Sequence, residues 1–125
     1  MKTFFLQIIF LALITNLTNA QIFVNTSAIG NNNGTSWQDA FNDLSEAIDS
    51  SNVNDEIWVA AGTYIPKNPS LWPDTIKRTF YLHQDVSLYG GFNGTETTLD
   101  QRDPATNVTI LSGDVNGDDV VDDFA

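Results

Sequence analysis

Hydrophobic and polar residues alternate with a helical period in the first half of the chain. Over residues 37–48, apolar side chains recur at spacings of three and four, which places them on one face of a helix. The apolar positions are Trp37, Ala40, Phe41, Leu44, Ala47 and Ile48. Thr35 or Ser36 is placed to cap the helix, with Gln38 or Asp39 three residues on. The pattern predicts an amphipathic helix that covers an apolar surface.

Elsewhere the apolar residues form short segments with a period of two. Such alternation, with many β-branched and aromatic residues, is typical of strands. We expect strands at residues 22–25, 57–62, 79–82, 86–91 and 109–113. Pro66, Pro69 and Pro73 indicate a rigid loop between the second and third of these strands.

Three of the strand segments share one order of residues: apolar, variable, small and then glycine. They are residues 59–62, 88–91 and 110–113, so that Gly62, Gly91 and Gly113 are spaced by 29 and 22 positions. A spacing in the twenties with a glycine corner in each unit indicates a solenoid of parallel strands. An antiparallel sandwich also has strands that end in glycine, and the spacing alone leaves both folds open.

The first 20 residues have the pattern of a secretory signal peptide. Lys2 supplies a positive charge, residues 4–14 are apolar except for Gln7, and Thr18 and Ala20 provide the small-x-small cleavage site. The apolar run is too short for a bilayer, which needs about 20 residues. We expect cleavage after Ala20 and a secreted or cell-surface protein, with no transmembrane segment in the mature chain. The alternative is a buried N-terminal strand or helix.

Charge and cysteine content narrow the possible partners. The chain has 16 acidic and 5 basic residues, a net charge of −11, and loss of Lys2 with the signal peptide lowers it by one more. Such a surface repels nucleic acid and anionic lipid, so we expect no nucleic-acid partner. The sequence contains no cysteine, so burial and backbone pairing must stabilise the fold without disulfides.

A family resemblance adds to these patterns. Residues 57–64 and 88–96 are its most specific parts, within a similarity that extends over residues 22–118. They resemble the N-terminal region of secreted bacterial proteins with right-handed parallel β-helix (pectin-lyase-like) repeats, related to chlamydial polymorphic outer-membrane protein-like repeats. The resemblance implies a mainly β fold. Residues 21–125 would form the N-terminal capping α-helix and first coils of a right-handed parallel β-helix, which is incomplete at residue 125.

The same resemblance implies a function without catalysis. It suggests an exported structural or adhesive module whose partner is an extracellular glycan or a surface protein. The alternative is the N-terminal fragment of a polysaccharide-active, pectin-lyase-like enzyme. No catalytic residue transfers from the family. His83 is the only histidine and has no partner at sequence level, while Lys67 and Arg102 fall in no acid–base spacing with the carboxylates.

The acidic C-terminal segment contains a candidate calcium site. Alternate oxygen-bearing side chains have the spacing of calcium-binding loops. The candidate ligands are Asp114, Asn116, Asp118 and Asp122. Asp119 stands where such loops have glycine, and Ala125 where they have the twelfth-position carboxylate. A solvated acidic loop without a metal is therefore the alternative, and we expect no other cofactor.

Aromatic side chains are candidates for stacking on sugars. They are Trp58, Tyr64, Trp72, Tyr81 and Tyr89. Alternation places Trp58 opposite Ile57 and Val59, on a side where it would be open to a sugar. For these aromatic residues we favour the alternative, which is packing under the Pro-rich loop or the capping helix.

Overall fold

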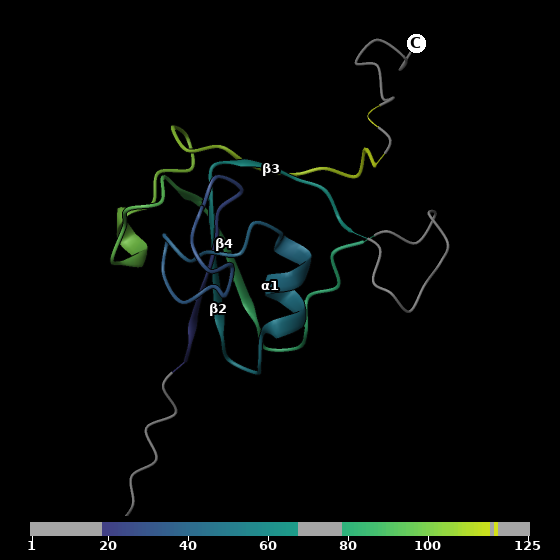
Figure 1. The fold of residues 1–125 in the computed structure, drawn as a ribbon, viewed down its shortest axis with the longest axis horizontal. Helices are drawn as coiled ribbons and strands as arrows, with labels where there is room; N and C mark the ends of the chain where they lie inside the picture. The colour runs from purple at the N-terminus through teal and green to yellow at the C-terminus, as the bar shows by residue number, and fades with distance from the viewer. Residues whose placement is uncertain (1–18, 68–78, 116, 118–125) are drawn as a thin grey trace, which may run out of the picture.

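The computed structural model describes residues 19–67, 79–115 and 117 of the 125-residue chain (Figure 1). The elements, in chain order, are β1 (Gln21–Val24), α1 (Leu44–Ser50), β2 (Glu56–Ala60), β3 (Gly62–Tyr64), β4 (Ser87–Phe92), the 3-10 helix η2 (Leu99–Gln101) and β5 (Thr109–Leu111). Strands β1, β2 and β4 form one parallel sheet with β2 in the centre, and β3 and β5 form a second parallel pair.

The central strand β2 explains why the larger sheet is buried on both faces. Its residues 57–60 are a continuous apolar run and all are buried. Such a run is typical of a parallel strand that is covered on both sides. The register pairs Ile22 with Ile57 and Ile57 with Leu88, so these three side chains form a row across the sheet.

Helix α1 covers one face of this sheet with an aliphatic layer (Figure 1). The helix contributes Leu44, Ala47 and Ile48, all nearly fully buried. The sheet and its flanks contribute Ile22, Val24, Ile57, Val59, Tyr64 and Val86. Because α1 is only seven residues long, this packing and its cap stabilise it more than its own backbone does.

An aromatic layer covers the opposite face of the same sheet. Each strand contributes one ring, and the rings are Phe23, Trp58 and Phe92. Trp58 and Phe92 stack with centroids 4.8 Å apart and planes 9° apart. Trp37, from the segment between β1 and α1, packs edge-on against Phe23 at 4.8 Å and in a tilted arrangement against Phe92 at 5.5 Å. The aromatic layer is thus closed by a loop and not by a helix.

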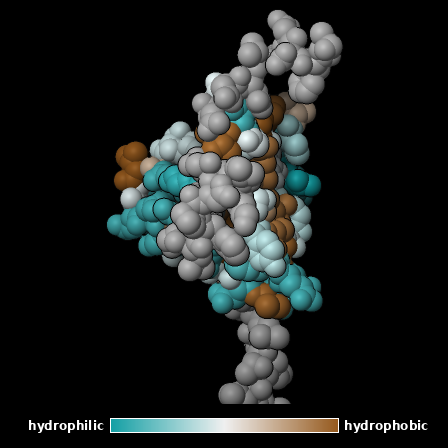
Figure 2. Space-filling view, turned by 90° about the vertical axis from the view of Figure 1, so that its right-hand side faces the viewer, coloured by the Kyte–Doolittle hydropathy of each residue, from teal (hydrophilic) through white to brown (hydrophobic). Residues whose placement is uncertain are grey.

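The smaller sheet is much more exposed. Strands β3 and β5 pair over three residues each, from Gly62 with Thr109 to Tyr64 with Leu111. Ile110 and Leu111 remain 48% and 45% exposed. Hydrophobic side chains (brown) also reach the surface on the face drawn in Figure 2, among hydrophilic ones.

The prediction of a right-handed parallel β-helix with a capping helix is wrong. The described residues form one helix and two small parallel sheets, with no closed or solenoid sheet. Strand β5 pairs with β3 and not with β4, and residues 79–82 form no strand. The three glycines at similar spacing do not share one backbone conformation. Gly62 and Gly91 have φ values of 150° and 95°, while Gly113 has no positive φ. They are therefore not equivalent corners.

The helix also begins later than predicted. Asp43 and not Thr35 or Ser36 is its N-cap, and the helix proper starts at Leu44. The backbone of Phe41 is hydrogen-bonded to β1, since its N–H donates to Phe23 O at 2.9 Å. Phe41 also forms a parallel bridge with Val24. A helix that began at residue 37 would break these bonds, so the helical spacing of Trp37 and Phe41 is coincidental.

The predicted signal peptide lies almost wholly outside the described residues. Ala20, the residue before the expected cleavage point, donates its N–H to Asp55 Oδ1 at 3.0 Å and accepts from Glu56 N at 2.9 Å. Cleavage after Ala20 stays a prediction, and it would remove both bonds. In the part of the chain that the structure describes, no helix has the length and apolar character to cross a membrane.

Candidate functional site

A groove lies where the start of α1 meets the segment that leaves β3. Its volume is about 510 Å³, and residues 42–44 and 63–67 line it. Asp43 is in this groove because it caps α1, and its Oδ1 accepts a hydrogen bond from Ser45 N at 2.7 Å. Aspartate suits this position because its short side chain reaches the unpaired amides of the first helical turn.

The other oxygen of Asp43 forms an ion pair with Lys67. Lys67 Nζ lies 2.5 Å from Asp43 Oδ2, with the aspartate side chain 5% exposed and the lysine 71% exposed. Oδ2 is buried and accepts no conventional hydrogen bond from the described residues, so the ion pair is its main compensation. The contact with Asp43 raises the pKa of Lys67 despite the opposing effect of desolvation. Lys67 therefore stays protonated and is unsuited to act as a base or nucleophile.

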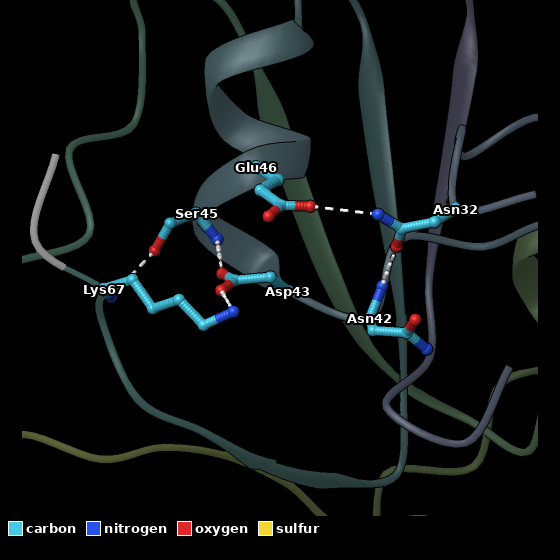
Figure 3. A network of polar contacts seen from close by, with 6 residues as sticks. All are labelled: Asn32, Asn42, Asp43, Ser45, Glu46 and Lys67. Atoms are coloured by element: carbon cyan, nitrogen blue, oxygen red, sulfur yellow. Dashed lines mark hydrogen bonds and ion pairs between the residues drawn. The ribbon is translucent and has the colours of Figure 1, made fainter. Parts of the chain in front are cut away.

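Further polar contacts extend from this ion pair (Figure 3). Asn32 Nδ2 donates to Glu46 Oε2 at 3.1 Å, and Asn32 Oδ1 accepts from Asn42 N at 2.8 Å. The backbone N–H of Lys67 donates to Ser45 Oγ at 3.2 Å. The network joins the segment before α1, the helix and the segment after β3. We interpret the network as structural, because it fixes these three segments relative to one another.

A second candidate is a polar pocket in the segment between β4 and β5. Its volume is about 400 Å³, and every residue that lines it is polar. The lining residues are Asn93, Thr95, Glu96, Gln101, Asp103, Thr106 and Asn107. The wall thus combines carboxylates, amides and hydroxyls, which together donate and accept hydrogen bonds.

Glu96 organises one side of this pocket. Its carboxylate is 7% exposed and accepts from three consecutive amides: Asn93 N at 2.7 Å, Gly94 N at 3.1 Å and Thr95 N at 3.0 Å. Burial acts to raise the pKa of Glu96, but these backbone hydrogen bonds outweigh it and hold the pKa below its ordinary value. Trp37 Nε1 donates to Glu96 O at 2.8 Å, which attaches the loop to the aromatic layer.

Gln101 and Asp103 organise the other side of the pocket. Gln101 Oε1 accepts from the amides of Thr97 and Thr98 at 2.7 Å and 3.1 Å. Asp103 accepts from both the amide and the hydroxyl of Thr106, and the hydroxyl contact is the main cause of its lowered pKa. The loop is therefore held in shape by its own side chains.

The sequence did not predict this pocket, although a signal was present. Thr98 and Gln101 have the T-x-x-Q spacing of a capping box, which here surrounds the short helix η2. That spacing indicates a local turn, but it does not reveal that residues 93–96 fold back to form the opposite wall.

The candidate calcium ligands are only partly described. Asp114 Oδ1 accepts from Gly117 N at 2.6 Å, as expected of a turn. Asn116, Asp118 and Asp122 lie outside the described residues. The described side chains, which do not include Asp118 and Asp122, form no group of three or more histidine, cysteine or acidic residues suited to a metal. The calcium site stays a prediction.

The aromatic candidates for sugar stacking have different positions. Trp58 points away from Ile57 and Val59, but it is 1% exposed and belongs to the aromatic layer. Aromatic packing inside the fold, and not exposure for sugar stacking, is therefore the outcome for Trp58. Tyr64 is also buried, with its hydroxyl donating to Ala60 O at 3.0 Å.

The remaining candidates lie nearer the surface. Tyr81 is 75% exposed and packs edge-on to His83, with ring centroids 6.1 Å apart. The guanidinium of Arg102 lies 5.5 Å from the ring centroid of Tyr89. Trp72 lies outside the described residues.

Comparisons of this chain with protein-family models, with curated proteins and with solved structures found no match.

Proposed function

We propose that this protein is a non-catalytic, exported adhesive module that binds a glycan in the pocket of residues 93–107. The observation that carries the proposal is the lining of the pocket, which consists entirely of carboxylate, amide and hydroxyl side chains. Sugar hydroxyls donate and accept hydrogen bonds at once, and a mixed wall of this kind meets both requirements.

The rigidity of the loop supports the same proposal. Glu96, Gln101 and Asp103 bond to the backbone of their own loop, and Trp37 holds it against the core. A ligand that enters a pocket already in shape avoids much of the entropy cost of ordering it. The predicted signal peptide would bring such a module to extracellular glycans.

Charge restricts the class of glycan. The chain has a net charge of −11, and Glu96 and Asp103 add two carboxylates to the pocket itself. Anionic polysaccharides such as uronic acid polymers are repelled by such a surface. We therefore propose a neutral or amine-bearing glycan.

Titration of the full chain with a panel of neutral, amino and acidic oligosaccharides tests the proposal. Asn107→Ala removes one amide from the pocket wall and should weaken binding. Asn52→Ala is the matched control, because Asn52 is an exposed asparagine outside the pocket. Binding that prefers acidic oligosaccharides, or that Asn107→Ala leaves unchanged, would contradict the proposal.

A further inference from the structure

The chain contains the tripeptide Asn-Gly-Thr twice among its described residues, at 33–35 and at 93–95. In both copies the threonine hydroxyl donates to the side-chain oxygen of the asparagine, at 2.7 Å and 2.6 Å respectively. The glycine has a positive φ in both copies, 73° and 95°. The two sites therefore share their local sequence and part of their geometry.

The two copies differ in the partner of the glycine nitrogen. Gly94 N donates to a carboxylate oxygen, Glu96 Oε2, at 3.1 Å. Gly34 N donates to a neutral carbonyl, the backbone oxygen of Asp39, at 2.8 Å. Only the second tripeptide thus has a potential base in contact with the N–H that follows its asparagine.

We propose that Asn93 is a site of self-catalysed succinimide formation and deamidation, with Glu96 as the general base, and that Asn33 is protected. The proposal does not depend on glycan binding. It concerns a covalent change of the chain itself, and water is the only other reactant.

The reaction balances as follows. Glu96 accepts the proton of Gly94 N, and this nitrogen attacks Cγ of Asn93. A bond forms between Gly94 N and Asn93 Cγ, while the bond from Cγ to the side-chain nitrogen breaks and that nitrogen leaves as ammonia after regaining the proton. The resulting five-membered succinimide is opened by water at either of its two carbonyls. The products are aspartate or an isoaspartyl linkage at position 93.

Two contacts around Asn93 each assist one part of this reaction. The Glu96 carboxylate accepts a hydrogen bond from Gly94 N–H, whose proton must be removed, and this contact is the requirement for general base catalysis. The Thr95 hydroxyl donates to the oxygen on which negative charge develops during attack. Because backbone amides hold the pKa of Glu96 low, the carboxylate is ionised at neutral pH.

The surroundings of Gly34 and Gly94 also favour reaction at Asn93 over Asn33. A methyl group placed on Gly34 would lie 2.6 Å from Cε2 of Phe41, so this backbone is held under an aromatic ring. The corresponding position on Gly94 meets only the side-chain Nδ2 of Asn25, at 3.1 Å. Gly94 therefore has more room for the backbone rotation that brings its nitrogen to Cγ.

Deamidation would change the polar pocket, since Asn93 is part of its wall. A third carboxylate would join Glu96 and Asp103. An isoaspartyl product would in addition lengthen the backbone by one atom within the loop. The modification would make the pocket more acidic as the protein ages.

Mass spectrometry of the full chain during incubation at neutral pH tests the proposal. Trypsin cleavage after Lys67 and Arg102 puts Asn33, Asn93 and Asn116 into separate peptides, so each Asn-Gly pair is followed by itself. In the folded protein, the Asn93 peptide should convert several-fold faster than the Asn33 peptide. In denaturant, the two rates should approach each other because the tripeptides are identical. Equal rates in the folded state, or an advantage of Asn93 that survives unfolding, would overturn the proposal.

Two variants test the assigned groups. Glu96→Gln preserves the size of the side chain and removes the base, and it should slow conversion of Asn93 by up to about 100-fold. Thr95→Val should also slow Asn93, and Thr35→Val is its matched control with no effect on Asn93. Because Glu96→Gln could loosen the loop, Thr95→Val provides the second readout. If both variants leave the Asn93 rate unchanged or raise it, the proposed mechanism is wrong.

Discussion

The two sheets of this protein use the same parallel pairing and are buried to very different extents. In the larger sheet, Trp58 and Phe92 are 1% and 0% exposed, whereas Ile110 and Leu111 of the smaller sheet are 48% and 45% exposed. The difference lies in what covers each face. The larger sheet has α1 on one side and the Trp37 loop on the other. The packing of other elements on the faces of a sheet, and not its strand pairing, therefore determines which sheet contributes most to stability.

Thr109 makes several of the polar contacts between the two sheets. Its Oγ1 accepts from Gly91 N at 3.0 Å and lies 3.3 Å from the carbonyl oxygens of Val59 and Ala60. A methyl group on Gly90 would lie only 2.8 Å from Cβ of Thr109, so glycine is needed for this approach. Tyr64 of β3 also packs in the aliphatic layer and donates its hydroxyl to Ala60 O. The rest of the smaller sheet is held mainly by backbone contacts and the Thr109 hydroxyl.

The largest effect is expected in the aromatic layer. Trp58→Ala removes the ring that stacks on Phe92 and should lower the free energy of unfolding by about 3–5 kcal/mol. This is a large share of the stability of a domain of this size, since the usual total is about 5–15 kcal/mol. Urea denaturation followed by far-UV circular dichroism, which does not rely on tryptophan fluorescence, measures the change.

Tyr81→Ala is the control for that substitution, because Tyr81 is an aromatic residue with 75% exposure. Its effect on the free energy of unfolding should stay within about 0.5 kcal/mol. A cost for Trp58→Ala as small as this would contradict the view that the larger sheet carries the stability.

The next largest effect concerns the cap that positions the helical cover. Asp43→Ala leaves Ser45 N without its side-chain partner and should cost about 0.5–2 kcal/mol of unfolding free energy. Lys67→Met removes the ion pair and leaves the cap in place. It should cost about 0–1 kcal/mol, because the lysine side chain is 71% exposed and water can take the place of its ammonium group at Asp43 Oδ2. Thermal melts of both variants measure the two effects. If Lys67→Met costs as much as Asp43→Ala, the ion pair and not the cap holds α1 in place.

A smaller effect is expected from the pH dependence of Glu96. Its pKa in the folded protein lies below the reference value of 4.5, so its ionised form stabilises the fold. This contribution is complete above pH 4.5 and is lost as the pH falls below that value through the folded pKa. Stability of the natural chain should therefore decline in this range more steeply than that of Glu96→Gln. Parallel curves for the two proteins in denaturation at pH 3–6 would contradict this account.

Local sequence pattern predicted where most strands lie, because alternation and β-branched residues act within a few positions. The segments expected at 22–25, 57–62, 86–91 and 109–113 each overlap an observed strand. It did not predict which strands pair, since pairing depends on residues far apart in the chain. It also did not identify what packs on Trp58, because a period of two cannot tell an exposed face from one that a distant loop covers.

The helix and the pocket show two further limits of the sequence. Trp37 and Phe41 fit the helical spacing, but they serve the aromatic layer and the bridge to β1 instead. The wall of the pocket depends on backbone amides that converge on Glu96. Backbone direction in a loop is set by tertiary contacts such as Trp37 to Glu96, and the sequence pattern does not contain them.

The smallest effect on stability, and a separate effect on association, is expected at β5. Val108, Ile110 and Leu111 are 52%, 48% and 45% exposed, and β3 is the only described strand that pairs with β5. An exposed strand edge with apolar side chains tends to pair with another molecule, and a lysine there prevents it. Ile110→Lys should therefore change the free energy of unfolding by no more than about 0.5 kcal/mol, while it lowers self-association.

Light scattering at increasing protein concentration, with urea denaturation of the same samples, measures both quantities. Ile29→Lys is the matched control, because Ile29 is 95% exposed but lies outside any strand. If both lysines reduce scattering equally, added charge and not the strand edge is responsible. If Ile110→Lys destabilises the protein as much as Trp58→Ala, the smaller sheet belongs to the same stabilising core, and the contrast between the two sheets fails. Low stability cost combined with loss of association at position 110 alone would instead place stability in the covered sheet and association in the uncovered one.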